Sequence, residues 1–312
     1  SVKQTFKSDE VELNILLDIG VAHERDKMKS NVGIYDSRNQ LNDLTGKEWL
    51  KLTTSVWFSR PEPLDEFKVQ HPATFAESDI EKLITLFTKK GMTVLDPFAG
   101  VGSTLIACHN TQRKGIGVEL NPKYVELTKK RFEKYGINTQ SILNAKSANG
   151  ISKINQRIIC GDSLDLLNLI QEPIHYCVTS PPYHNILKNK GNGIRHDGSQ
   201  KRQGVVYYSD HPNDLGNQKT FDKFLDLLQQ VFYKVYKLLI NGRYISVIIS
   251  DFTVNKQEVD VHGCIIRKLQ EIGYIFKGTT ILVQENKPIY PYGYPYQYVI
   301  NHHHQYIINF QK

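Results

Sequence analysis

The chain has 312 residues, of which 40% are hydrophobic and 23% are charged. This length can bury one large core, so we expect one main α/β domain with insertions. The formal net charge of +7 suits a polyanionic partner without identifying one. The four cysteines form no C-x-x-C pair, which argues against a disulfide framework or a thiolate metal site. No apolar run approaches the roughly 20 residues of a membrane span, and the polar start lacks a signal-peptide core, so a soluble intracellular protein is expected.

Two strand–helix units are predicted in the first half of the chain. Residues 1 to about 60 are mixed and polar. From Ser78 to Lys90 the apolar residues fall at helical spacing, with Ser78 as the expected N-cap. The segment TVLDPFAGVGST then indicates a strand, a glycine turn and the start of a helix. The strand GIGVEL and a helix from about Pro122 to Tyr135 follow it.

The second half continues this alternation. RIICGDSLDLLNLI and HYCVTSPPY contain two more strand ends, and the basic stretch HNILKNKGNGIRHDGSQKRQG lacks periodicity, which indicates a mobile surface loop. Helices are predicted over about Phe221 to Leu239 and Val261 to Ile272, on either side of the strand RYISVIIS. TILVQ and QYIINF are the last strands. This order predicts a doubly wound, mostly parallel α/β sheet with a C-terminal antiparallel hairpin.

Three successive strand ends in the first half are suited to a nucleoside. Asp96 opens the glycine loop DPFAGVGS, where glycines let a ligand approach the backbone closely. The loop lacks the full G-x-G-x-x-G spacing and a Walker lysine, which disfavours a phosphate cradle. Glu119 ends the next strand, where it can accept hydrogen bonds from two ribose hydroxyls, and Asp162 at a third strand end can accept from an adenine amino group. The alternatives are a glycine turn that only joins strand to helix and solvated strand-end acids.

A strand-end loop in the second half is suited to amino-group chemistry. Ser180, Pro181, Pro182 and Tyr183 follow an apolar run, and the two prolines remove backbone donors and stiffen the loop. The exocyclic nitrogen of cytosine or adenine is a poor nucleophile, because its lone pair is delocalised into the ring. If Ser180 and the Pro181 carbonyl accept its two N–H bonds, the nitrogen can attack a sulfonium methyl in line, while Tyr183 stacks on a base swung out of the duplex. In isolation, S-P-P-Y would indicate only a proline-rich surface turn.

The residues from about Trp57 to Arg131, with HPATF, KKGMTVLDPFAGVGSTLIA and KGIGVELNPKYVELTKKR, resemble the cofactor-binding half of bacterial amino-DNA methyltransferases. The S-P-P-Y motif, DLGNQKTFDKFL, RYISVIISD and PYGYPYQYVINHHHQYIINFQK resemble later parts of the same family. In sequences of this kind S-P-P-Y usually comes first, whereas here the cofactor half leads, an order that circular permutation explains. The serine form of the motif is commoner among cytosine-N4 than adenine-N6 enzymes.

The resemblance implies a sheet of the S-adenosylmethionine-dependent methyltransferase (Rossmann-like) type. It divides the chain into an N-terminal segment, residues 1–50, and a methyltransferase domain, residues 51–312. That domain has a cofactor half, residues 51–150, and a catalytic half, residues 151–312, which contains the basic loop 184–206. Residues 1–50 and the basic loop are the candidates for target recognition, because no extended block remains elsewhere.

The expected cofactor is S-adenosylmethionine, with no metal. Its expected binding residues are Thr53, Ser55, His71, Asp96, Phe98, Ala99, Gly100, Gly102, Ser103, Glu119, Leu120, Asp162 and Ser163. The expected catalytic residues are Ser180, Pro181, Pro182 and Tyr183, and the expected DNA contacts are Lys188, Lys190, Arg195, Lys201 and Arg202. The run His302-His303-His304 is not expected to bind metal, because adjacent strand residues alternate faces and no further ligand spacing completes a set.

These expectations describe a site-specific DNA methyltransferase of the bacterial cytoplasm that methylates N4 of a flipped-out cytosine in a restriction-modification or related system. Double-stranded DNA is the expected partner, a cognate restriction endonuclease is a candidate second partner, and the protein is expected to be a monomer or homodimer. Attack on cytosine C6 is disfavoured, because no cysteine follows a proline. The alternatives are adenine-N6 methylation, methylation of RNA or a protein amide, nicotinamide-dependent hydride transfer, and an inactive DNA-binding module.

Overall fold

The computed structural model describes residues 33–60, 62, 65–68, 75–137, 155–182, 214–254, 257–285 and 287–312. Their main feature is an eight-stranded sheet with the order β1-β9-β10-β6-β5-β2-β3-β4. In that order the strands are β1 (Val56–Ser59), β9 (Ile275–Gln284), β10 (His304–Gln311), β6 (Leu239–Ile249), β5 (Ile174–Thr179), β2 (Thr93–Asp96), β3 (Lys114–Glu119) and β4 (Arg157–Cys160). β10 is antiparallel to both β6 and β9, and the other neighbouring strands of this sheet are parallel. The predicted mostly parallel sheet and its C-terminal antiparallel hairpin are therefore confirmed.

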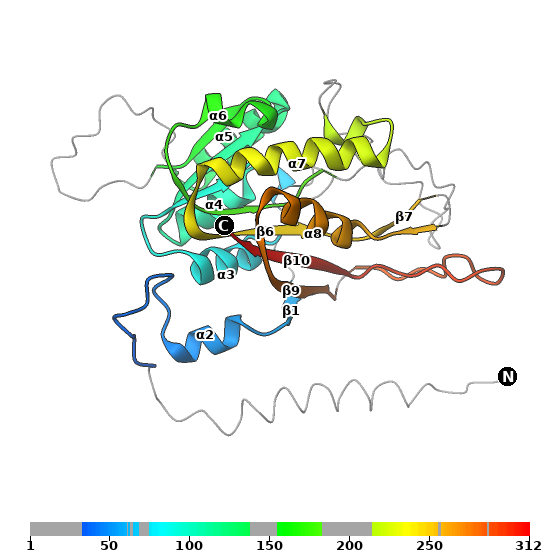
Figure 1. Ribbon diagram of the computed structural model, residues 1–312, viewed down its shortest axis with the longest axis horizontal. Helices are drawn as coiled ribbons and strands as arrows, with labels where there is room; N and C mark the ends of the chain where they lie inside the picture. Colours follow the sequence, from blue (N-terminus) through cyan, green and yellow to red (C-terminus); the bar gives the residue numbers. More distant parts are fainter. Residues whose placement is uncertain are drawn as a thin grey trace.

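Helices cover both faces of the sheet, with α3 on one side and α7 and α8 on the other (Figure 1). The helices are α2 (Gly46–Leu52), α3 (Glu77–Phe87), α4 (Ser103–Asn110), α5 (Pro122–Lys134), α6 (Leu166–Leu169), α7 (Phe221–Leu238) and α8 (Val261–Ile272). Short 3-10 turns, η2 (Ser163–Asp165) and η4 (Leu215–Asn217), and a small ladder of β7 (Phe252–Val254) with β8 (Gln257–Val259) complete the described elements. Among the described residues no helix is both long and apolar enough to span a membrane.

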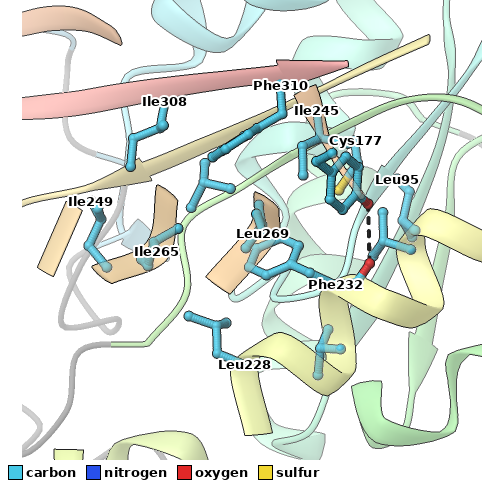
Figure 2. Close-up of a cluster of buried hydrophobic side chains, with 14 of the residues drawn as sticks. Leu95, Cys177, Leu228, Phe232, Ile245, Ile249, Ile265, Leu269, Ile308 and Phe310 are labelled. Carbon is cyan, nitrogen blue, oxygen red and sulfur yellow. Dashed lines mark hydrogen bonds between the residues drawn. The ribbon is translucent and has the colours of Figure 1, made fainter. Parts of the chain in front are cut away.

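Adjacent residues of the central strands enter two different cores, because successive side chains of a strand point to opposite faces. Leu95 of β2 and Cys177 of β5 pack towards α7 and α8, whereas their neighbours Val94 and Tyr176 pack with α3. Figure 2 shows the first of these cores, in which Leu228 and Phe232 of α7 and Ile265 and Leu269 of α8 lie against Leu95, Cys177, Ile245, Ile249, Ile308 and Phe310 of the sheet. These strands are buried on both faces, which explains why they are apolar runs in the sequence.

The predicted helices agree with α5, α7 and α8 to within one residue at each end. The helix predicted from Ser78 begins instead at Glu77, and its N-cap, Ala76, makes no side-chain cap. The prediction of Ser78 as N-cap was wrong, because a carboxylate distant in the sequence binds the free N–H groups at the start of α3. Glu62 accepts hydrogen bonds from the backbone N–H groups of Glu77 and Ser78, both at 2.8 Å, and an anion at a helix N-terminus is favourable.

Candidate active site

The carboxyl ends of β2, β3, β4 and β5 lie along one edge of the sheet, because these strands are parallel. From β2 the chain moves outward to β3 and β4, and then returns to the other side of β2 to form β5. The edge between β2 and β5 is thus a topological switch point, where open α/β sheets leave a crevice for a ligand. Asp96, Glu119 and Thr179 are the last residues of β2, β3 and β5.

The loop after β2 has a conformation that requires glycine. Gly100 and Gly102 have φ values of 52° and 78°, which are left-handed. A Cβ atom on Gly102 would lie 2.5 Å from Cγ2 of Thr128. Even the methyl group of alanine would therefore force the backbone or the Thr128 side chain to move. The loop is also tied to β3, because the N–H of Ala99 donates to the carbonyl of Val118 at 3.0 Å. These contacts fix a tight backbone turn at the N-terminus of α4.

Arg131 of α5 supports the glycine loop from inside the protein. Its guanidinium group is fully buried and donates to the carbonyl of Val101 at 2.6 Å and to Oγ of Ser103 at 3.3 Å. The same group pairs with the carboxylates of Asp65 and Glu77, each at 2.8 Å. One buried cation therefore joins the loop, α3, α5 and the segment before α3.

Lys68 extends this buried network. Its ammonium group pairs with Glu77 and, at 3.3 Å, with Glu62. Glu62 also caps α3 by accepting hydrogen bonds from the backbone N–H groups of Glu77 and Ser78. Burial raises the pKa of Glu62, but the hydrogen bonds it accepts lower this pKa to about 2. Glu62 is therefore charged and paired at neutral pH, as a largely buried carboxylate requires.

Asp96 joins the two halves of the edge. Its carboxylate accepts hydrogen bonds from the N–H of Phe98 at 3.0 Å, from Oγ1 of Thr104 at 2.6 Å and from Oγ1 of Thr179 at 2.6 Å. Only 1% of Asp96 is exposed, and this burial raises its pKa while the three donors oppose the shift. Asp96 thus holds the glycine loop against the end of β5, and its carboxylate is occupied by the protein's own donors.

Glu119 is positioned at the end of β3 with its carboxylate beside the glycine loop. Oε2 accepts from the N–H of Gly100 at 2.9 Å, and Oε1 accepts from the N–H of Asn121 at 2.7 Å. Burial raises the pKa of Glu119 to about 7, the nearby acids Asp96 and Asp214 add to the rise, and the two backbone bonds oppose it. The surroundings of Glu119 are therefore electronegative, which disfavours an anionic ligand and suits neutral donors or a cation.

The loops after β4 and β5 complete the edge. Asp162 caps η2 by accepting from the N–H of Leu164 at 2.8 Å, and Oγ of Ser163 donates to the carbonyl of Pro97 in the glycine loop. Ser180 is half-buried directly after Thr179, Pro181 is buried and Pro182 is half-buried. The carboxyl edge thus brings the cofactor-type loop and the S-P-P segment to adjacent strands.

Parts of the chain are similar to known proteins. Residues 6–130 match the family described as "DNA methylase". These residues, about two fifths of the chain, are similar to that family. The type II methyltransferase M.BglI of Bacillus subtilis is 33% identical over 118 residues, which are 38% of this chain and 32% of that protein. M2.DpnII of Streptococcus pneumoniae is 30% identical over 112 residues, 36% of this chain and 40% of that protein.

The match to these two type II methyltransferases therefore spans about a third to two fifths of their length. Among solved structures, TrmN from Thermus thermophilus aligns with 76% of this chain and 48% of its own, at 13% identity and a TM-score of 0.45. A putative DNA modification methylase from Thermus thermophilus aligns with 49% of this chain and 50% of its own, at 20% identity and a TM-score of 0.33.

Most of the described residues expected to bind the cofactor lie together at the carboxyl edge of the sheet. Ala99, Gly100, Gly102 and Ser103 are buried in or beside the glycine loop, and Phe98, Glu119, Leu120 and Asp162 are half-buried at the strand ends. His71, Tyr183 and the basic residues Lys188, Lys190, Arg195, Lys201 and Arg202 lie outside the described residues.

Thr53 and Ser55 are not brought to this edge. Thr53 ends α2, where its Oγ1 donates to the carbonyl of Trp49 at 3.0 Å, and Ser55 immediately precedes β1. β1 is the outermost strand, and it runs in the same direction as β2 and β3 because β10 is antiparallel to both of its neighbours. The start of β1 therefore lies at the amino edge, opposite the glycine loop, which corrects the expected position of these two residues.

A cluster of polar residues that was not among the predicted site residues follows β6. Asp251 accepts from the N–H groups of Val261 and His262 at 2.9 and 3.0 Å, and from Nδ1 of His262 at 2.8 Å. Asp260 accepts from the N–H of Gly263 at 2.8 Å, and the His262 ring stacks on Tyr306 at 4.0 Å. Within the described ranges, Asp251, Asp260 and His262 bring potential metal-ligand atoms within 4.8 Å of one another. Capping of α8 accounts for both carboxylates, so their clustering has a structural cause.

Proposed function

We propose that this protein transfers a methyl group from S-adenosylmethionine to an exocyclic amino group of a base in DNA, and that cytosine N4 is the preferred acceptor. The observation that carries the proposal is the contact between Asp96 and Thr179, which are 83 residues apart in the sequence. This contact ties the glycine loop to the residue before Ser180. One buried carboxylate thus joins the proposed cofactor loop to the proposed amino-activating loop. Holding the cofactor and the target base next to each other in this way favours transfer of a group from one to the other.

The residues at the carboxyl edge fit the nucleoside part of S-adenosylmethionine. The glycine turn is packed tightly against α5, because a Cβ atom on Gly102 would collide with the buried Thr128, and this packing holds the loop at the strand ends where the nucleoside would bind. Glu119 offers a carboxylate whose pKa is raised to about 7, so hydroxyl donors from a ribose would stabilise its ionised form. Ser163 and Asp162 follow β4 beside this loop, and Asp162 is the candidate acceptor for the adenine amino group.

The electrostatics of this edge disfavour the nicotinamide alternative. A dinucleotide would bring a pyrophosphate with two negative charges to the glycine loop, next to Glu119 and Asp96. The acids Asp96 and Asp214 already raise the pKa of Glu119 by repulsion, and an anion would add to that cost. S-adenosylmethionine instead carries a sulfonium cation, which an electronegative site stabilises.

The chemistry assigned to this chain is positioning rather than covalent catalysis. When bound, S-adenosylmethionine supplies the electrophilic methyl group. Ser180 and the Pro181 carbonyl would accept the two N–H bonds of the target amino group, so that its lone pair becomes available for attack. With its lone pair freed in this way, the amino nitrogen would bond to the methyl carbon as the carbon–sulfur bond of the cofactor breaks, and it would lose one proton to water. Tyr183 would stack on the displaced base.

DNA is the proposed partner, and the basic loop 184–206 is the proposed phosphate-binding segment. Lys188, Lys190, Arg195, Lys201 and Arg202 would release counterions from DNA on binding. A cognate endonuclease is the candidate second partner within a restriction-modification system. The DNA methylase match over residues 6–130 and the two type II relatives support this assignment.

Nucleoside mass spectrometry tests the proposed function. DNA from cells that express the protein is digested and compared with DNA from cells that express Ser180→Ala. We expect N4-methylcytosine with the parent protein and a strongly reduced amount with the variant. If N6-methyladenine were found instead, the choice of cytosine would be wrong, but the proposal of an amino-methyltransferase would stand. Unmodified DNA, or 5-methylcytosine, would overturn the class itself.

A further inference from the structure

The connection between β9 and β10 displays tyrosine side chains to solvent. Tyr292, Tyr294, Tyr296 and Tyr298 are 53%, 81%, 92% and 87% exposed, and Tyr290 is 38% exposed. The segment extends beyond the ends of β9 and β10, away from the packed layers of the protein (Figure 1). We call residues 287–303 the tyrosine hairpin. Isolated exposed apolar groups are ordinary, but a gathering of large aromatic rings at one point marks an interaction surface.

The tyrosine hairpin is a built structure. At its base, Asn301 accepts from the N–H of Tyr290 at 2.9 Å and donates to the carbonyl of Tyr290 at 2.8 Å. At its apex, the carbonyl of Gly293 accepts from the N–H groups of Tyr296 and Gln297 at 2.8 and 2.9 Å. Gly293 has a φ of 76°, and a Cβ atom there would lie 2.4 Å from the carbonyl oxygen of Gln297. The backbone is therefore folded so that the rings of its tyrosines point outward.

The position of the tyrosine hairpin relates it to the candidate active site. β9 runs parallel to β6 and β5, because β10 is antiparallel to both β9 and β6. The end of β9 and the start of β10 therefore lie at the same carboxyl edge as the ends of β2, β3 and β5. Two strands, β6 and β10, separate β9 from β5, which Ser180 follows.

The charge of this segment is compatible with a polyanion. Residues 286–312 contain no Asp or Glu. They contain two lysines, Lys287 and Lys312, and the run His302-His303-His304. Carboxylates are frequent elsewhere, since the chain contains 32 of them. Residues 287–303 themselves carry large rings, one lysine and no carboxylate, and the nearby carboxylates are at the base, where Glu258 lies 2.8 Å from His302 and Glu285 precedes the hairpin. The apex can therefore approach nucleic acid without like-charge repulsion from its own residues.

We propose that the tyrosine hairpin stacks on unpaired bases of the DNA where the target base is displaced from the duplex. This inference rests on the proposed function. Displacing a base costs unstacking and unpairing energy, and aromatic rings that stack on exposed bases offset that cost. Tyr294, Tyr296 and Tyr298 are the most exposed of these tyrosines. Tyr294 and Tyr296 lie at the apex, so we assign the main stacking contacts with the bases to these two rings.

Binding to duplexes with an unpaired base tests the proposal. Affinities are measured by fluorescence anisotropy for a 20-base-pair duplex with a single-base bulge and for the fully paired duplex. The double variant Tyr294→Ala/Tyr296→Ala should lose affinity for the bulged duplex by roughly tenfold or more, because two stacking rings are removed. Affinity for the paired duplex should change much less. The salt dependence should be unaltered, because no phosphate contact is removed.

A matched control removes two exposed tyrosines elsewhere. Tyr135 and Tyr233 are 43% and 47% exposed, after α5 and on α7, and the Tyr135→Ala/Tyr233→Ala protein should bind the bulged duplex like the parent. The pair Tyr294→Phe/Tyr296→Phe keeps the rings and should also retain affinity. If the Phe pair lost as much affinity as the Ala pair, the hydroxyl groups would be responsible and stacking would be refuted.

The assay contains no methyl transfer, so its result is independent of whether the chain methylates DNA. Equal binding of the bulged duplex by the parent and the Tyr294→Ala/Tyr296→Ala protein would overturn the proposal. If the parent also formed dimers that this variant did not form in sedimentation experiments, the tyrosine hairpin would be an interface between two copies instead. Urea unfolding of both proteins checks that the variant is folded, without reference to the cofactor.

Discussion

The two ends of the carboxyl edge use their polar and aromatic side chains in opposite ways. Beside β2 and β3, the side chains of Asp96 and Arg131 are fully engaged by internal partners. Beyond β9 and β10, the rings of Tyr294 and Tyr296 are almost entirely exposed. A small ligand demands a prearranged site held by buried contacts, whereas a long polymer can be contacted by a projecting surface. Changes near β2 should therefore affect stability and cofactor binding, and changes in the tyrosine hairpin should affect DNA binding alone.

The largest expected effect is on stability, at Arg131. Arg131→Ala would leave the buried carboxylates of Asp65 and Glu77 without this cation, and removing one partner of a buried pair costs about 3–5 kcal/mol. Urea unfolding measures the change. Arg157→Ala is the matched control, because its pair with Glu172 is partly exposed and such pairs contribute within about 1 kcal/mol. Equal losses in the two variants would contradict the buried role of Arg131.

The next effect is on chemistry, at Ser180. Ser180→Ala removes an acceptor needed as the amino nitrogen becomes tetrahedral, so the methyl-transfer rate should fall on the order of 10²-fold. Affinities for S-adenosylmethionine and DNA should hold. Single-turnover transfer of a tritiated methyl group to DNA measures the rate. If the variant methylated DNA at the parent rate, the assignment of the S-P-P segment to the active site would be wrong.

The pH dependence of cofactor binding reports on Glu119. Its pKa is raised to about 7, so below pH 7 the free protein carries a protonated carboxyl there. Ribose hydroxyls bind the ionised form, so affinity should fall by about tenfold per pH unit below 7 and level off above it. Calorimetry from pH 5.5 to 8.5 tests this. Glu119→Gln should bind more weakly and without this dependence; a parent profile that stays flat would exclude Glu119 from the site.

The smallest expected effect is at Thr53 and Ser55. Both are exposed at the amino edge, on the far side of the sheet from the glycine loop. Thr53→Ala and Ser55→Ala should each bind S-adenosylmethionine with the parent affinity in the same calorimetric experiment. A clear loss in either variant would restore the interpretation drawn from the family resemblance and would require this segment to reach the carboxyl edge.

Local signals explain what the sequence could predict. Asp96, Glu119 and Ser180 each follow a short apolar run and precede a glycine or proline turn, so their place at strand ends can be inferred from neighbouring residues alone. The order of strands in the sheet is not a local property. Thr53 and Ser55 precede β1, a strand that the sequence did not predict and that joins the far end of the sheet beside β9.

Long-range contacts account for the rest. Arg131 lies in a charged helix and would be expected to face solvent, yet it pairs with acids 66 and 54 residues away. Ser78 satisfies the local rule for an N-cap, but Glu62 supplies the cap from 15 residues earlier in the chain. The tyrosines between β9 and β10 could equally have filled a core, and only the folded arrangement reveals that they are exposed.

Calorimetric titration of S-adenosylmethionine in EDTA, with two glycine variants, tests most directly that the glycine loop is a prebuilt cofactor site. Gly102 and Gly91 have nearly the same φ, 78° and 79°, so alanine is strained at both positions. A Cβ atom would collide with Thr128 at Gly102 and would meet nothing within 4 Å at Gly91. We predict that the parent and Gly91→Ala bind without a metal ion and that Gly102→Ala does not bind. A parent protein that binds only with a divalent cation, or equal binding by the two variants, would contradict this account.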